Sequence, residues 1–154
     1  MLDRDDIDGV EMRQYGVIYF TRTNNSKRVA EKIAKKLSCE VVQITDNINW
    51  KGLLGYLKAG FYSMTNRHVD IEYLGNLDAV EEYIIVGPLW AGGLAPAMKT
   101  ALSQFPRNKV HLVVTSLGSL VKDRAGYLSV LDITDNTGNE DLMIEDLVNN
   151  LLKA

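Results

Sequence analysis

The chain has 154 residues, of which 46% are hydrophobic and 24% are charged, and its formal net charge is −3. These values are typical of a single globular domain, so we expect residues 1–154 to share one core. The mild negative charge disfavours non-specific nucleic-acid binding, and no apolar run is long enough to span a membrane.

The N-terminus and the few sulfur and imidazole side chains predict a cytoplasmic protein without a metal site. Residues 1–6 are acidic and polar, unlike a signal peptide. Cys39 is the only cysteine, so no disulfide can form within the chain, and its place between a helix and a strand favours a small core residue over the alternative of a reactive thiol. His68 and His111 have no cysteine or carboxylate partners at the spacing of metal ligands.

The first predicted element is a strand at Val17–Phe20, preceded by a polar arm over residues 1–14. A polar loop follows, and apolar residues then recur at helical spacing as far as Leu37. The loop consists of Thr21, Arg22, Thr23, Asn24, Asn25 and Ser26. A helix start offers unpaired backbone N–H groups and a positive dipole end, so the hydroxyls and amides around it can hold a phosphate monoester. Arg22 and Lys27 can offset the charge of such a phosphate.

The same loop also fits a plain strand-to-helix turn with Ser26 or Asn25 as the N-cap. The loop by itself does not decide between the two interpretations. It lacks the GxxxxGK[ST] pattern of nucleoside triphosphatases and the GxGxxG pattern of dinucleotide-binding folds, so both of those classes are disfavoured.

The middle of the chain continues the alternation of strand and helix. The predicted strands Val41–Ile44 and Tyr83–Val86 lie on either side of a glycine-interrupted helical segment, Trp50–Tyr62. A proline- and glycine-rich loop extends from Gly87 to Pro96. The next helix carries the apolar residues Met98, Ala101, Leu102 and Phe105.

The last third of the chain predicts two more strands and a helix. The fourth strand is Val110–Val114, the loop Thr115–Ser119 follows, and the fifth strand lies around Tyr127–Ile133. The final helix begins near Asn139. Its predicted inward face consists of Leu142, Leu147, Val148, Leu151 and Leu152.

Alternating strands and helices predict an α/β fold with a doubly wound, parallel, five-stranded sheet. Uninterrupted β-branched runs indicate strands that are covered on both faces. Only about a dozen residues connect strands four and five, which is too few for a full βαβ unit. The helix between them is therefore vestigial, or the fifth strand is arranged differently. A lost helix leaves apolar side chains uncovered, so we expect a homodimer or a docked partner unless the last helix or the N-terminal arm covers the gap.

Three loops meet at the carboxyl edge of such a sheet, where doubly wound folds bind their ligands. The first is the polar loop described above. The second contains Pro88, Leu89, Trp90, Ala91, Gly92 and Gly93. The third is Thr115–Ser119, in which Ser116, Leu117 and Gly118 are the expected binding residues. Trp90 can stack on a flat ring while the glycines let backbone amides approach its edge, although a tryptophan at a helix start can also be a plain core residue. Together the loops predict a ligand with a phosphate at one end and a flat ring at the other.

The polar loop resembles the phosphate loop of the flavodoxin-like family, which reads [ST]-x-T-G-x-[ST]. Thr21, Thr23 and Ser26 match its three hydroxyl positions, and Asn24 replaces its glycine. Asparagine adopts the left-handed backbone conformation more readily than most residues, so we expect the loop to keep its shape.

Two further segments support the resemblance, which covers about Gly16 to Ile133. Pro88–Gly92 is similar to the P-x-W-x-G loop of many small flavodoxin-like proteins, and Gly52–Gly60 is similar to another segment of that branch. Leu117 stands where many flavodoxins place a tyrosine against the flavin. The resemblance implies a flavodoxin-like fold that binds FMN non-covalently through the three loops.

The function that the resemblance implies first is electron transfer, with the flavin as the redox group and no catalytic side chain. Backbone groups of Ala91, Gly92 and Gly93 are then expected near the reactive edge of the flavin. The partner is a redox protein or a small-molecule electron acceptor. One alternative is an NAD(P)H-dependent FMN or quinone reductase, which an open ring face favours. The other is a flavin-free module on the same fold, which the asparagine at position 24 leaves open.

Overall fold

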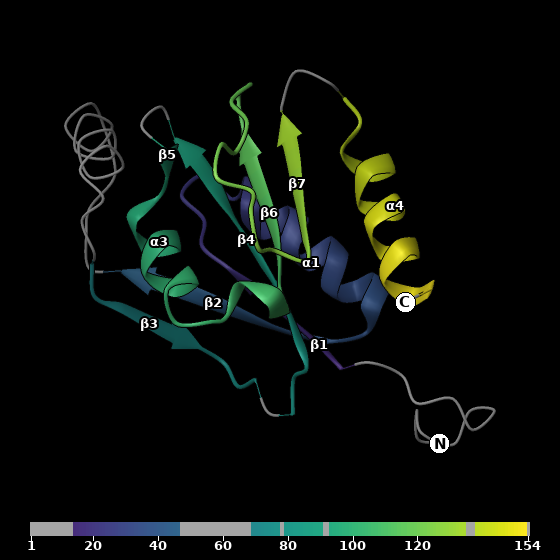
Figure 1. Cartoon of the computed structure of the whole chain (residues 1–154), viewed down its shortest axis with the longest axis horizontal. Coiled ribbons are helices and arrows are strands. Elements are labelled where there is room, and N and C mark those ends of the chain that lie inside the picture. The colour runs from purple at the N-terminus through teal and green to yellow at the C-terminus, as the bar shows by residue number, and fades with distance from the viewer. Residues whose placement is uncertain (1–13, 47–68, 78, 91–92, 135–137, 154) are drawn as a thin grey trace.

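The computed structural model describes residues 14–46, 69–77, 79–90, 93–134 and 138–153, which form one sheet with helices on both faces (Figure 1). The strands are β1 (Tyr15–Tyr19), β2 (Glu40–Asp46), β3 (Ile71–Leu74), β4 (Glu82–Trp90), β5 (Gly93–Leu94), β6 (Val110–Ser116) and β7 (Ser129–Thr134). The α-helices are α1 (Asn25–Leu37), α3 (Pro96–Leu102) and α4 (Glu140–Lys153), and η2 (Arg107–Lys109) is a short 3-10 helix.

Five strands run parallel in the order β2-β1-β4-β6-β7. The order changes direction between β1 and β4, as it does in doubly wound folds, so the predicted fold class is confirmed. The described residues form two further strands that the sequence analysis did not predict. β3 pairs antiparallel with β2 at one edge of the sheet, and β5 pairs antiparallel with the end of β4. The sheet therefore has seven strands rather than five.

Both faces of the central strands are buried, as the uninterrupted apolar runs predicted. Val17 and Tyr19 of β1 pack against α1 and α4. Ile18 and the adjacent Phe20 pack on the opposite face, in the core that contains α3. Gly87 of β4 allows a close approach on the α3 face, because a Cβ at that position would lie 2.2 Å from the sulfur of Met98.

Helix α1 begins directly after the polar loop, as predicted. Asn24 is its N-cap and has φ 69° and ψ 3°, so the expectation that asparagine tolerates the left-handed conformation is confirmed. The N-cap is neither Ser26 nor Asn25, the two residues considered for a ligand-free turn. The side chain of Asn24 makes no capping hydrogen bond, and its carbonyl accepts one from the Arg28 N–H at 3.0 Å.

The connection between β6 and β7, residues 117–128, contains no helix, so the shortened connection is confirmed. The connection itself covers this part of the sheet. Val121 is buried in the α3-side core, and Tyr127 packs against the same core. The carboxylate of Asp132 accepts hydrogen bonds from the Val121 N–H, at 2.8 Å, and from the guanidinium of Arg124. The expectation of uncovered strand side chains is therefore corrected, because ordered backbone without helical structure takes the place of the missing helix.

Helix α4 packs beside α1, but two of the leucines expected to face inward do not. Leu142 and Leu152 are 64% and 52% exposed, so their predicted orientation is wrong. The buried face consists of Ile144, Leu147, Val148 and Leu151. At about 100° per residue, Leu142 falls on the opposite side of the helix from this stripe.

Some expectations concern other parts of the chain. The segment Trp50–Tyr62 and the predicted arm, apart from its last residue, lie outside the described residues. Phe105 lies beyond the end of α3, although it packs against the same core. Within the described ranges, the structure contains no helix that is both long enough and apolar enough to span a membrane.

Candidate functional site

The ends of β1, β4, β6 and β7 enclose a cleft of about 650 Å³ at the carboxyl edge of the sheet. The arrowheads of β4, β6 and β7 point toward this edge in Figure 1. All three predicted loops contribute to its walls. The predicted site residues that line it are Arg22, Thr23, Asn25, Pro88, Leu89, Trp90, Ser116 and Leu117.

The remaining predicted site residues are placed differently. Those that the structure describes away from the cleft walls are Thr21, Asn24, Ser26, Gly93 and Gly118. Ala91 and Gly92 lie outside the described residues, so the expected backbone contacts of these two residues stay predictions. The cleft walls also include Thr115 and Ser119, the two ends of the predicted third loop. The other wall residues were not assigned to a site from the sequence: Arg28, Ile133, Thr134, Gly138, Glu140 and Asp141.

Thr21 lies between β1 and α1 and does not line the cleft. Its Oγ1 atom is buried and has no hydrogen-bond partner among the described residues. A buried hydroxyl in this state costs about 1–3 kcal/mol unless a ligand or water satisfies it. The loop that was expected to hold a phosphate therefore contains one polar group that a ligand can stabilise.

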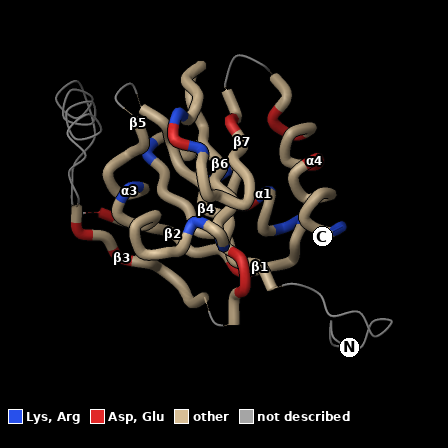
Figure 2. The backbone as a smooth tube through the Cα atoms, viewed as in Figure 1, with Lys and Arg blue, Asp and Glu red and all other residues tan. Residues whose placement is uncertain are grey.

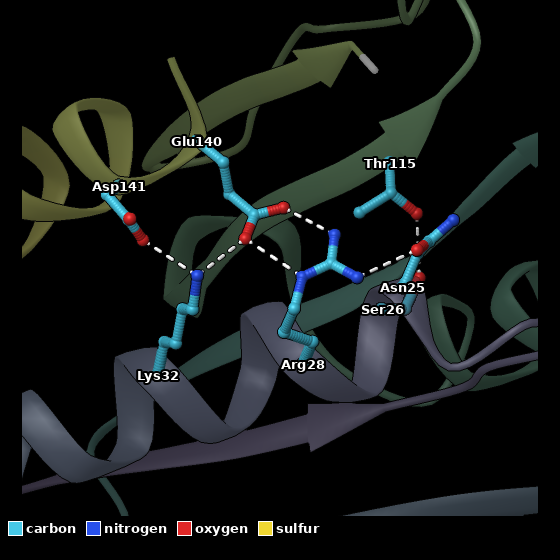
Figure 3. Close-up of polar contacts among 7 residues, drawn as sticks. All are labelled: Asn25, Ser26, Arg28, Lys32, Thr115, Glu140 and Asp141. Carbon is cyan, nitrogen blue, oxygen red and sulfur yellow. Dashed lines mark hydrogen bonds and ion pairs between the residues drawn. The ribbon is translucent and has the colours of Figure 1, made fainter. Parts of the chain in front are cut away.

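Ser26 points away from the cleft and into the space between α1 and β6. Its side chain is 1% exposed, and its Oγ shares a hydrogen bond of 2.8 Å with Oγ1 of Thr115 (Figure 3). Thr115 lies two residues after Val113, so both side chains point to the α1 face of β6. Thr115 lines the cleft, and Ser26 supports it from behind.

A charged network joins α1 to the first turn of α4, and its members Arg28, Glu140 and Asp141 line the cleft (Figure 3). The guanidinium of Arg28 donates two hydrogen bonds to Glu140, at 3.0 and 2.6 Å, and a third to the side chain of Asn25 at 2.8 Å. Lys32 donates to Glu140 at 2.8 Å and to Asp141 at 2.7 Å. Mainly through its hydrogen bond with Arg28, the pKa of Glu140 is lowered to about 2.

This network was missed from the sequence because its members lie more than 100 residues apart along the chain. The acidic first turn of α4 was visible, but it suits the helix dipole without any partner. Figure 2 shows the acidic residues at the start of α4 and the basic residues along the neighbouring α1. The ion pairs form because α1 and α4 lie side by side, and that arrangement arises only when the sheet has folded.

Trp90 ends β4 instead of lying in a loop. β4 continues through Pro88 to Trp90, and the short strand β5 folds back along it, with Trp90 opposite Gly93. The indole ring packs edge-on against Phe20, with ring centroids 6.3 Å apart, and it also lines the cleft. The ligand-stacking and core interpretations of Trp90 are therefore compatible, because the half-buried ring is held by the core and faces the cleft.

The third wall is a compact turn after β6. The Ser116 hydroxyl donates a hydrogen bond to the Ser119 carbonyl at 2.7 Å and accepts one from the Gly118 N–H at 3.2 Å. Leu117, at the tip of this turn, is 83% exposed. This side of the cleft therefore ends in an apolar side chain that covers little of the space beside it.

The described residues contain no cluster of three or more histidine, cysteine or carboxylate side chains that could hold a metal ion. No protein-family model matches the sequence, and no curated protein matches it. Similarity is found among solved structures.

A crystal structure of a flavoprotein in complex with FMN from Lactobacillus acidophilus matches with a TM-score of 0.60 and 19% identity, over 85% of this chain and 98% of that one. An inferred flavoprotein from Bacteroides uniformis matches with a TM-score of 0.68 and 15% identity, over 89% and 99% of the two chains. The fold is flavodoxin-like. A further inferred flavoprotein, from Bacteroides eggerthii, matches with a TM-score of 0.64 and 15% identity, over 92% and 98%. In this flavodoxin-like fold the cleft occupies the edge at which doubly wound sheets bind ligands.

Proposed function

We propose that the chain binds FMN in this cleft and transfers electrons through it to or from a redox protein or a small molecule. One observation carries the proposal, namely that the polar loop at the start of α1, Trp90 and the turn after β6 line a single cleft. The similar structures supply independent support, since each is described as a flavoprotein and one contains FMN.

The residues at the α1 end of the cleft fit a phosphate monoester. The first turn of α1 offers backbone N–H groups and the positive end of the helix dipole. Thr23 and Arg22 line the wall, and the neighbouring Thr21 has a buried hydroxyl with no hydrogen-bond partner among the described residues. Two guanidinium groups line the cleft, those of Arg22 and Arg28, and the charge of Arg28 is balanced by Glu140, so the neutral donors and Arg22 suit a dianionic group without building up excess positive charge.

The residues at the other end fit a flat ring system. Leu89 and Trp90 form one apolar wall, and Leu117 stands at the opposite turn. A ring held against Trp90 loses contact with water on that side, while the exposed Leu117 leaves the other side open. When bound, the flavin supplies the redox chemistry, and the chain binds it, orients it and controls its access to water.

A second candidate function is an NAD(P)H-dependent FMN or quinone reductase. The observation that favours it is the 83% exposure of Leu117, because an uncovered ring face admits a second planar molecule. Rapid bleaching of bound flavin by NAD(P)H alone would identify the reductase. Bleaching only in the presence of a reduced redox protein would identify the electron carrier.

The first experiment tests the phosphate loop. FMN and riboflavin are titrated into a Trp50→Phe variant, in which Trp90 is the only tryptophan, and binding is followed by quenching of its emission. Adding Thr21→Ala and Thr23→Ala should weaken FMN by roughly 10-fold or more, because hydrogen bonds to a charged group are lost. Riboflavin has no phosphate and should change little.

The control is Thr45→Ala in the same background, a strand threonine that does not line the cleft. Equal losses for FMN and riboflavin would overturn the assignment of the loop. Tryptophan emission that stays constant while the fluorescence of the flavin itself shows that FMN binds would overturn the assignment of Trp90. A chain that binds neither ligand would be the flavin-free module.

A further inference from the structure

The pattern of the phosphate loop assigns three hydroxyls to the ligand, but only that of Thr23 belongs to a residue that lines the cleft, and the structure adds a threonine from outside this loop, Thr115. Ser26 is 1% exposed and does not line the cleft. Thr115, which belongs to β6, does line the cleft. Its Oγ1 lies 2.8 Å from Oγ of Ser26. A side chain outside the loop therefore occupies the position in front of Ser26.

The donor and acceptor roles in the Ser26–Thr115 pair determine which of the two hydroxyls can donate a hydrogen bond to an anion. In a pair of hydroxyls one donates and the other accepts, and the accepting group keeps its own proton for a further partner. A phosphate oxygen accepts hydrogen bonds, so it stabilises the arrangement in which Ser26 donates to Thr115 and Thr115 donates into the cleft. Such a chain also strengthens the outer bond, because each hydrogen bond polarises the next.

We propose that Thr115 is the hydroxyl that contacts the terminal phosphate of the ligand, and that Ser26 is a positioning residue that orients it. The inference rests on the proposed FMN site and deepens it. Selectivity for a phosphorylated ligand then depends on β6 as well as on the loop after β1. Thr115 also lies opposite Pro88 of β4 in the sheet, so it stands between the phosphate end and the ring end of the cleft.

The test compares FMN with riboflavin in four variants, each titrated by flavin fluorescence. Thr115→Val keeps the shape of the side chain and removes the hydroxyl, so FMN should weaken roughly 10- to 100-fold while riboflavin changes less than about 2-fold. Thr115→Ser keeps the hydroxyl and should stay within about 3-fold of the unmodified chain for both ligands. Ser26→Ala removes only the orienting group, so it should cost FMN less than Thr115→Val does. Thr45→Val is the matched control and should change neither ligand.

The outcomes separate this inference from the proposed function. If the unmodified chain shows no preference for FMN over riboflavin, the phosphate site itself is wrong. If it prefers FMN and Thr115→Val retains that preference, only the role of Thr115 is wrong. A loss from Ser26→Ala that abolishes the preference would also overturn the role of Thr115, because Ser26 would then be the direct contact. This last comparison remains decisive if Thr115→Val fails to fold.

Discussion

Asn24 illustrates how one residue type can keep a loop in shape where the family pattern has glycine. Its φ of 69° lies in the left-handed region, which most side chains enter only at a cost of about 1–2 kcal/mol. Glycine adopts it readily, and asparagine adopts it more readily than most other residues do. Asn24 therefore holds in this loop a left-handed conformation of the kind that glycine adopts readily.

Replacing Asn24 tests this interpretation. Asn24→Ala should lower the free energy of unfolding by about 1 kcal/mol, whereas Asn24→Gly should stay within about 0.5 kcal/mol of the unmodified chain. Urea unfolding followed by circular dichroism measures both. Asn108→Ala in the exposed helix η2 is the control. A glycine variant as unstable as the alanine variant would show that the side chain, and not the backbone conformation, matters.

At the scale of elements, the network of Arg28, Lys32, Glu140 and Asp141 ties α4 to α1. Each bond bridges two helices that the sheet already holds side by side. Because Arg28 and Lys32 are 45% and 37% exposed, solvent screens their attraction to the carboxylates, and the network stabilises the fold modestly.

The depressed pKa of Glu140 makes this contribution depend on pH. Because that pKa is lowered from 4.5 to about 2 in the folded chain, the stabilisation is present above about pH 4.5 and is lost as the pH falls toward 2. Glu140→Gln should therefore lower the free energy of unfolding by about 1 kcal/mol at pH 7, and the difference should shrink between pH 5 and pH 2.

The matched control is Glu145→Gln, an exposed residue of the same helix for which the described residues provide no ion pair. It should have little effect at either pH. A deficit for Glu140→Gln that is as large at pH 2.5 as at pH 7 would contradict the assignment.

At the scale of the whole molecule, the exposed apolar side chains are a candidate surface for self-association. The β6–β7 connection covers the sheet but presents Leu117, Leu120 and Leu128 at 83%, 61% and 44% exposure. A homodimer therefore stays a prediction, with these leucines rather than bare strands as its basis.

Sedimentation equilibrium should show an assembly larger than the 17.2 kDa chain at high micromolar concentration. Leu120→Gln combined with Leu128→Gln should shift it toward the monomer, and Leu142→Gln on the exposed side of α4 should not. An unmodified chain that remains monomeric would refute the prediction. An effect of Leu142→Gln alone would move the contact to α4.

The parts of this fold that the sequence predicts are those with strong local signals. The apolar runs of β1, β4 and β6 and the turn at the start of α1 are each visible within a few residues. β3 was missed because only four residues alternate there, with Ile71 and Tyr73 turned inward and Glu72 outward. The alternation of inward and outward residues is present in the sequence, but four residues give too weak a signal to predict a strand at the edge of a sheet.

The candidate site was predictable from the sequence only for residues whose position follows from the end of a single strand. Thr23 follows the end of β1 and Trp90 is the last residue of β4, so both could be placed at the carboxyl edge from the strand order alone. The contacts of Thr115 with Ser26 and of Glu140 with Arg28 span 89 and 112 residues. No local pattern encodes such pairs, because their geometry depends on how strands and helices pack.

The helix-free β6–β7 connection has a consequence for the order in which the chain folds. Thr115 pairs with Ile133, 18 residues further along, whereas Gly16 of β1 pairs with Tyr83 of β4, 67 residues further along. The entropy lost on closing a loop grows with the logarithm of its length, so the second closure costs roughly 1 kcal/mol more. Among the parallel pairings of the sheet, β6–β7 is therefore the one that an unfolded chain reaches at the lowest entropic cost. The strand that carries Thr115 can then be in place before the polar loop after β1 arrives, so that this wall of the cleft acts as a template for the other.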